Sequence, residues 1–219
     1  MVDASLASQS CPSYSQAGRF LPALIVSCFM TKAAKKIPAE HDFALVIDGV
    51  DDLSETVMDA LFEAGCDDAT FTIRHGRLYG EFSRSARSLK DAILSAIKDV
   101  RQANVGAVVL RVDNCELVTQ AEIARRIGRS RQMILQYING NRGPGGFPAP
   151  ECHLAEGAPL WAWCAVSSWL AKNDIIRPEA KWDATVVAAI NATLDVHRQH
   201  AEHPELLEEI ERCVAAGAK

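Results

Sequence analysis

The chain has 219 residues, of which 48% are hydrophobic and 23% are charged, and its formal net charge is -5. These values exclude fibrous, collagen-like and fully disordered proteins, and the length is sufficient for one large or two small domains. A net acidic chain is also a poor candidate for coating nucleic acid without sequence preference.

Cysteine usage and the N-terminal region indicate a cytoplasmic protein. The seven cysteines are odd in number, scattered and free of any CxxC pair, which favours reduced thiols over a disulfide framework. The apolar run from Phe20 to Val26 is too short to span a bilayer, and lysines follow it where small neutral residues would mark signal cleavage. We therefore expect residues 1–40 to be a poorly ordered extension, with Met30 as an alternative natural start, and we expect no membrane association.

Residues 41–115 alternate between strand and helix patterns. Strands are predicted over 43–47, 69–74, 77–83 and 106–112, and amphipathic helices over 53–64 and 88–103. This order is that of a ferredoxin-like βαββαβ domain, in which both helices cover one face of an antiparallel sheet. The other face would be open to a second copy. The region has no Gly-rich phosphate loop, and its acidic residues are expected at caps and turns rather than around a metal ion.

Residues 117–147 carry an excess of positive charge in this otherwise acidic chain. Against a single acidic residue, Glu122, they contain five arginines: Arg125, Arg126, Arg129, Arg131 and Arg142. Arginine is the residue best suited to forked hydrogen bonds with phosphate or guanine. The local charge therefore predicts a surface that binds nucleic acid.

The same stretch has the pattern of two short helices joined by a glycine-containing turn. Thr119 followed by Glu122 predicts a capping box, in which side chains and backbone amides satisfy each other at a helix start, and Gly128 ends that helix. Ser130 then caps a second helix, predicted over 131–138. Two short helices joined in this way form a helix-turn-helix.

The second helix presents side chains suited to reading bases. With Ile134 and Ile138 inward, its outer face carries Arg131, Gln132, Leu135, Gln136 and Asn139. In the major groove, arginine recognises guanine, glutamine and asparagine recognise adenine, and an apolar group contacts the thymine methyl. A solvated pair of helices is the structural alternative, because a bare helix-turn-helix pattern is weak.

Residues 143–170 favour a winged helix. A Gly- and Pro-rich loop over 143–150 precedes two segments, 151–154 and 159–163, that can form a hairpin about Glu156–Gly157. Four residues then follow at spacings that pack one face of a final short helix: Trp161, Val166, Trp169 and Leu170. A helix pair followed by a small hairpin and another helix is the order of a winged helix.

On these residues the chain resembles a known family. The run VTQAEIARRIGRSRQMILQYINGNRGPGGFPAP followed by LWAWCAVSSWL is similar to the AlpA/excisionase-type branch of the MerR-like helix-turn-helix proteins, over about residues 117–171. The shared features are the Ser-Arg start of the recognition helix, the Phe-Pro-x-Pro start of the wing and the Trp-x-x-x-x-Val-x-x-Trp-Leu close. The resemblance implies a DNA-binding transcription regulator or recombination accessory protein, with recognition positions at Ser130, Arg131, Gln132 and Gln136.

The sequence departs from this family at the wing tip, which carries Glu156 and no lysine or arginine. A wing without a cation is poorly suited to phosphate or minor-groove contact, so Arg142 at its base is the better candidate. The predicted DNA-binding residues are therefore Thr119, Gln120, Arg125, Arg129, Ser130, Arg131, Gln132, Gln136, Asn139 and Arg142.

The C-terminal segment is predicted to be helical over 181–199 and 204–215. The apolar faces of these helices can either cover the winged helix or pair between subunits. His197, His200 and His203 recur every third residue, and a solvated helix face is favoured over a metal site there.

Together these patterns predict an α+β protein with an extension over 1–40, a ferredoxin-like domain over 41–115, a winged helix-turn-helix over 116–172 and a helical tail over 173–219. We expect a sequence-specific regulator of bacterial type that binds double-stranded DNA as a homodimer, because one recognition helix reads only a few base pairs. The alternative is an antitoxin-like module that binds a protein partner or a ligand through the ferredoxin-like domain. No enzyme, cofactor or metal site is predicted, because no catalytic constellation or cofactor fingerprint occurs.

Overall fold

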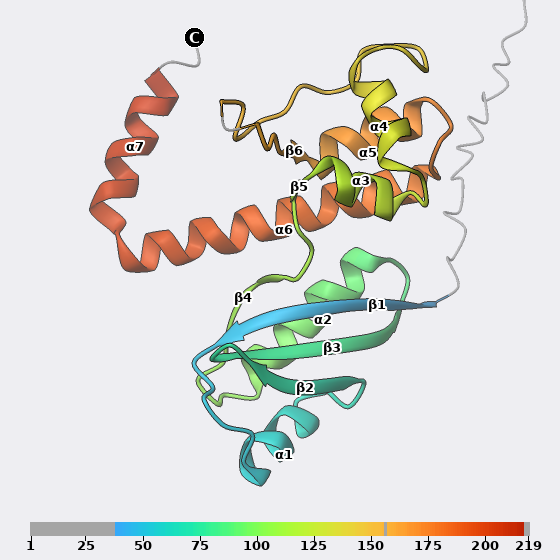
Figure 1. The fold of residues 1–219 in the computed structure, drawn as a ribbon. Helices are drawn as coiled ribbons and strands as arrows, with labels where there is room; N and C mark the ends of the chain where they lie inside the picture. The colour runs from blue at the N-terminus through green and yellow to red at the C-terminus, as the bar shows by residue number, and fades with distance from the viewer. Residues whose placement is uncertain (1–37, 156, 217–219) are drawn as a thin grey trace, which may run out of the picture. The chain divides into compact units, whose positions relative to one another are not determined.

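The computed structural model describes residues 38–155 and 157–216 (Figure 1). These residues form a mixed α+β structure with seven helices and a four-stranded antiparallel sheet. Most of the predicted extension over 1–40 lies outside the described residues, whose first strand begins at Ala39. In the two described ranges, no helix combines the length and apolar character needed to cross a membrane.

The sheet consists of β1 (Ala39–Asp48), β2 (Ala69–Arg74), β3 (Arg77–Ala86) and β4 (Val108–Val112). Its strand order is β2-β3-β1-β4, and all neighbouring strands are antiparallel. His75 and Gly76 both have positive φ and connect β2 to β3, as expected of a tight hairpin turn. Strand β1 begins four residues earlier than predicted, because backbone pairing with β3 continues through its polar end, which has no apolar signal.

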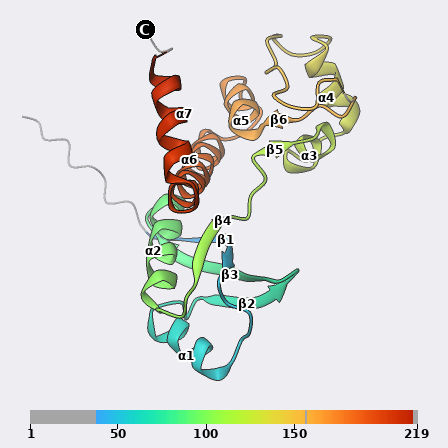
Figure 2. The same cartoon turned by 90° about the vertical axis from the view of Figure 1, so that its left-hand side faces the viewer.

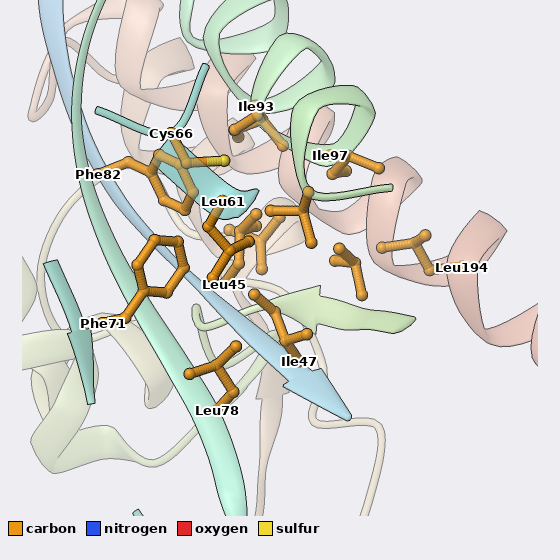
Figure 3. Packing of buried hydrophobic residues seen from close by; sticks show 14 of the residues in the cluster. Leu45, Ile47, Leu61, Cys66, Phe71, Leu78, Phe82, Ile93, Ile97 and Leu194 are labelled. Carbon is orange, nitrogen blue, oxygen red and sulfur yellow. The ribbon is translucent and has the colours of Figure 1, made fainter. Parts of the chain in front are cut away.

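Helices α1 (Glu55–Glu63) and α2 (Leu89–Gln102) contribute to the core on one face of this sheet. Figure 3 shows Leu45 and Ile47 of β1 facing Leu61 of α1, with Ile93 and Ile97 of α2 beside them. Among the apolar side chains of α1, Leu61 is buried and Val57 is partly buried against this core. The core therefore depends more on α2, which buries Ala92, Ile93, Ala96, Ile97 and Val100 on one face.

One charged side chain, Arg84 of β3, is buried at the margin of this core. Its guanidinium donates to both carboxylate oxygens of Asp68 at 2.6 and 2.8 Å and to Asp99 at 2.6 Å. It also donates to the Gly65 carbonyl at 2.7 Å and to the Ser95 hydroxyl at 3.1 Å. Hydrogen bonds to Asp68 and Asp99 raise the pKa of Arg84, so the side chain stays charged although only 7% of the residue is exposed.

We expect Arg84→Ala to lower the free energy of unfolding by about 3–5 kcal/mol, because two partly buried carboxylates lose their partner. The matched control is Arg87→Ala, at an exposed arginine, which we expect to change it by less than about 0.5 kcal/mol. Urea unfolding followed by circular dichroism measures both values. Equal effects of the two substitutions would show that the Arg84 network contributes nothing.

Helix α6 (Pro178–Glu202) joins the C-terminal segment to the sheet (Figures 1 and 2). It packs against β4 and α2, and also against α5 (Trp163–Lys172). Val187 and Leu194 are buried in the same core as the sheet residues, and Asn191 between them is 1% exposed. The helix begins three residues before the predicted range 181–199 and ends three residues after it. It packs on both α5 and an edge of the sheet.

The Asn191 side chain bonds to the backbone of one residue at that edge. Its Oδ1 accepts a hydrogen bond from the Val112 backbone N–H at 2.8 Å, and its Nδ2 donates to the Val112 carbonyl at 3.1 Å. Val112 belongs to β4, the outermost strand on this side. The amide therefore takes the place of one residue of a further strand.

Helix α7 (Pro204–Ala216) follows and packs against α6. It leaves an apolar stripe exposed at Leu206, Ile210 and Val214. The His200 ring lies 3.1 Å from a carboxylate oxygen of Glu211 and so pairs the two helices when the ring is protonated.

We expect Asn191→Leu to destabilise the fold by about 1–3 kcal/mol for each of the two Val112 groups that it leaves unpaired. The Val112 amide should also exchange its hydrogen faster, which NMR or mass spectrometry can measure. Thr193→Leu, on the exposed side of the same helix, is the control and should leave that exchange unchanged. Retained protection of Val112 in Asn191→Leu would refute this role.

Candidate nucleic-acid interface

The first helix of the arginine-rich stretch is α3 (Gln120–Arg126), and Thr119 is its N-cap. Thr119 Oγ1 accepts a hydrogen bond from the Glu122 backbone N–H at 3.2 Å. The Glu122 carboxylate, however, accepts from the guanidinium groups of Arg125 and Arg126 at 2.6–2.8 Å. The predicted capping box is therefore half formed, because a charged donor holds a carboxylate more strongly than a backbone amide does.

The turn between α3 and α4 (Arg131–Ile138) is fixed by backbone bonds around Gly128. Gly128 has a φ of +62°, and its N–H donates to the Arg125 carbonyl, while the Arg129 N–H donates to Ala124. This pair of hydrogen bonds is a Schellman motif. The motif needs a residue in the left-handed conformation and therefore favours glycine. Ser130 accepts from the Met133 N–H at 3.2 Å and caps α4. The predicted end of α3 at Gly128 and the predicted bounds of α4 are confirmed.

Gln120 fastens the two helices to each other. Its side-chain Nε2 donates to the backbone carbonyl of Arg131 at 2.7 Å, so the first turn of α3 is tied to the first turn of α4. Thr119, Gln120 and Ser130, which were predicted at the DNA surface, therefore have defined structural partners. Thr119 caps α3, and Gln120 and Ser130 bond to the first turn of α4.

The outer face of α4 matches the predicted face. Arg131, Gln132, Leu135 and Asn139 are exposed, and Gln136 is half-buried. Ile134 is fully buried, whereas Ile138 is only half-buried. Tyr137 occupies the second buried position, which apolar periodicity alone did not identify because a tyrosine can lie on either side of a helix.

The arginines of this stretch have different environments. Arg129, Arg131 and Arg142 are exposed, and none of them forms an ion pair with another described residue. Arg125 pairs with Glu122, yet three quarters of its side chain is exposed. The positive charge available to a ligand is therefore concentrated at the start of α4 and in the loop after it.

Arg126 has a structural role instead. Its guanidinium donates to Glu122 at 2.8 Å and to the Cys115 carbonyl at 3.0 Å, and it lies 4.9 Å from the centre of the Trp163 ring. Only 15% of its side chain is exposed. Sequence reasoning counted this arginine with the others, because adjacent arginines on a short helix look alike until the surrounding elements are known.

Aromatic residues hold the Gly- and Pro-rich loop. Trp169 Nε1 donates to the Gly145 carbonyl at 2.9 Å, and Trp161 Nε1 donates to the Pro148 carbonyl at 3.1 Å. Phe147 packs against the Trp169 ring with centroids 5.0 Å apart. The loop that follows Arg142 is therefore anchored at two points on a second core cluster, which is built from residues of β5 (Leu117–Val118), α3, α4, β6 (Trp161–Ala162) and α5 and includes Trp161 and Trp169.

The segment beyond this loop differs from the prediction. Trp161 does not belong to the final helix: it forms β6 (Trp161–Ala162), which pairs antiparallel with β5 (Leu117–Val118). The expected hairpin is reduced to one bridge between Cys152 and Leu160, and its predicted tip residue Glu156 lies outside the described residues. Tertiary pairing with a strand more than 40 residues earlier took precedence over the local helical spacing.

Within residues 38–155 and 157–216, no group of three or more histidine, cysteine, aspartate or glutamate side chains is placed to hold a metal ion. Comparisons with protein-family models, curated proteins and solved structures found no match for this chain.

The Glu122 carboxylate makes the stability of the fold depend on pH. Hydrogen bonds from Arg125 and Arg126 hold the pKa of Glu122 at about 2, below its ordinary value of 4.5. A lowered pKa stabilises the fold above about pH 4.5, and this contribution is lost as the pH falls toward 2. We expect Glu122→Gln to lower the urea midpoint clearly at pH 6 and less at pH 3.

The control is Glu63→Gln, a surface substitution at an exposed carboxylate of α1, which should change the urea midpoint little. A difference between wild type and Glu122→Gln that is the same at both pH values would contradict the role of the Glu122 charge.

Proposed function

We propose that this protein binds double-stranded DNA in a sequence-specific manner and that α4 reads the major groove. One observation carries the proposal: the exposed face of α4 bears Arg131, Gln132, Leu135 and Asn139, and exposed arginines without ion-pair partners among the described residues lie on either side of it. A merely solvated helix pair needs no such concentration of unneutralised charge in an acidic chain. This favours DNA binding over the structural alternative.

The finer fold is part of the same proposal. The strand order β2-β3-β1-β4, with α1 and α2 contributing to one core, supports a ferredoxin-like domain. The order of α3, α4, the Cys152–Leu160 bridge and α5 supports a winged helix-turn-helix of the AlpA/excisionase type. We infer a non-enzymatic regulator that acts in the cytoplasm and needs no cofactor.

Different side chains have different tasks in this proposal. Arg129 and Arg142, with the exposed part of Arg125, neutralise phosphates and set the position of the helix on the duplex. Arg131, Gln132, Gln136 and Asn139 discriminate bases, and Leu135 contacts a thymine methyl. Thr119, Gln120 and Ser130 hold the helix starts in place.

The length of α4 limits what one copy can read. Eight helical residues span about 12 Å, which is enough for only a few base pairs in the major groove. A specific site in a genome therefore calls for two copies bound to two half-sites.

We expect Arg131→Ala to weaken binding to the preferred duplex by about 1–3 kcal/mol and to relax the base preference at one position. The preferred duplex is first selected from a random pool with the wild-type chain, and affinities are then measured by fluorescence anisotropy at two salt concentrations. Arg87→Ala, remote in sequence and exposed on the sheet domain, is the matched control and should bind like wild type.

Arg129→Ala should instead weaken binding to all duplexes alike and reduce the salt slope by about 1, because it removes one phosphate contact. If the pool shows no enrichment, or if Arg131→Ala and Arg87→Ala bind equally well, base reading by α4 is refuted. The antitoxin-like alternative, in which the sheet domain binds a partner, would then be pursued.

A further inference from the structure

The backbone groups at the two edges of the sheet differ in their hydrogen-bond partners. At the β4 edge, the N–H and carbonyl of Val112 bond to Asn191 of α6. At the other edge β2 is the outermost strand, and no strand of the described residues pairs with its outer side. An exposed strand edge is a template for pairing with another chain.

The register identifies which backbone groups are open on β2. The Ser83 N–H donates to the Asp68 carbonyl at 3.0 Å, so this pair is of the hydrogen-bonded kind. The register continues unbroken to Arg74 opposite Arg77, so the even-numbered residues of β2 bond to β3. Phe71 and Ile73 therefore point their N–H and carbonyl groups out of the sheet. Ala69 leaves only its carbonyl there, because its N–H donates to the Cys66 carbonyl at 3.2 Å.

Strand β2 also lacks the devices that protect an edge. Its sequence ATFTIR contains no proline, glycine or lysine, and its only charge, Arg74, stands at its end. Ile73 is 39% exposed, and α1, which lies beside β2 in both views of the fold, exposes Phe62 at 65% (Figures 1 and 2). Apolar side chains thus accompany the open backbone groups.

We propose that β2 pairs antiparallel with β2 of a second copy, about a two-fold axis at Phe71, to form one continuous sheet. In this register Phe71 faces the partner's Phe71, and Ala69 faces the partner's Ile73. Phe71 then exchanges two hydrogen bonds with the partner's Phe71, and the Ile73 N–H of each copy donates to the partner's Ala69 carbonyl.

The side chains suit this register. Thr70 lies opposite the partner's Thr72 in a close, non-hydrogen-bonded pair, an arrangement that favours threonine contacts across strands. Arg74 lies level with the partner's Asp68, whose carboxylate is already held by Arg84, and next to the partner's Asp67, which is exposed and supplies the opposite charge. A parallel, in-register pairing would instead place the two Arg74 side chains together, which is unfavourable.

This pairing supplies the two copies that the proposed function calls for, but it is argued from the sheet alone. Failure of DNA selection would not contradict the β2 pairing. A monomeric chain that still selects DNA would refute the pairing but not the proposed function.

Sedimentation of the full chain over a range of concentrations tests the pairing. We expect a dimer whose dissociation constant rises about 10- to 100-fold in Ile73→Pro, because the substitution removes one outward N–H in each copy and no bond to β3. Ile73→Lys should have a similar effect, because the pairing would remove one lysine charge of each copy from water. Val108→Lys, at an exposed position on the opposite edge strand, is the control and should leave the dimer unchanged.

Cysteine cross-linking tests the register. Thr70→Cys mixed with Thr72→Cys should form a disulfide between copies beyond the background that either variant gives alone, because these positions face each other at a Cα distance suited to a disulfide. A monomer at all concentrations would overturn the proposal. So would a dimer unaffected by Ile73→Pro and Ile73→Lys but lost in Val214→Lys, which lies on the exposed stripe of α7.

Discussion

The hydrogen bonds between Asn191 and Val112 determine how the rest of this structure is organised. Two bonds from one buried amide attach α6 to the last strand of the sheet, and Val187 and Leu194 bury their side chains on either side of it. The same helix packs against α5, which belongs to the second core cluster. A single helix thereby contributes to one core, packs on one sheet edge and contacts α5, which shares a core cluster with α3 and α4.

Arginine illustrates how one residue type serves opposite purposes here. Arg84 is buried and fully engaged by two carboxylates, so its charge is neutralised and contributes to folding. Arg126 is held by Glu122 and Trp163 and supports α3. Arg129 and Arg131 follow within five residues of it and are exposed. Net charge and local composition identify the stretch, whereas only the partners of each guanidinium separate structural arginines from those available to a ligand.

Local rules account for what sequence reasoning predicted well. The bounds of α4, the glycine that ends α3 and the two-residue turn between β2 and β3 follow from caps, left-handed residues and periodicity, all of which depend on neighbours within a few positions. The outward face of α4 followed in the same way, since a helix fixes which side chains share a face. These features required no knowledge of distant contacts.

The sequence by itself determined the order of strands and helices through β4, the charge-rich stretch and the composition of the α4 face. Tertiary structure alone decided that Trp161 pairs in β6 with β5, that Glu122 binds arginines rather than completing its capping box, and that α6 covers β4 but leaves β2 open. The physical reason is that these outcomes are competitions between a local partner and a distant one. Their result depends on which groups folding brings together, and no short window of sequence contains both competitors.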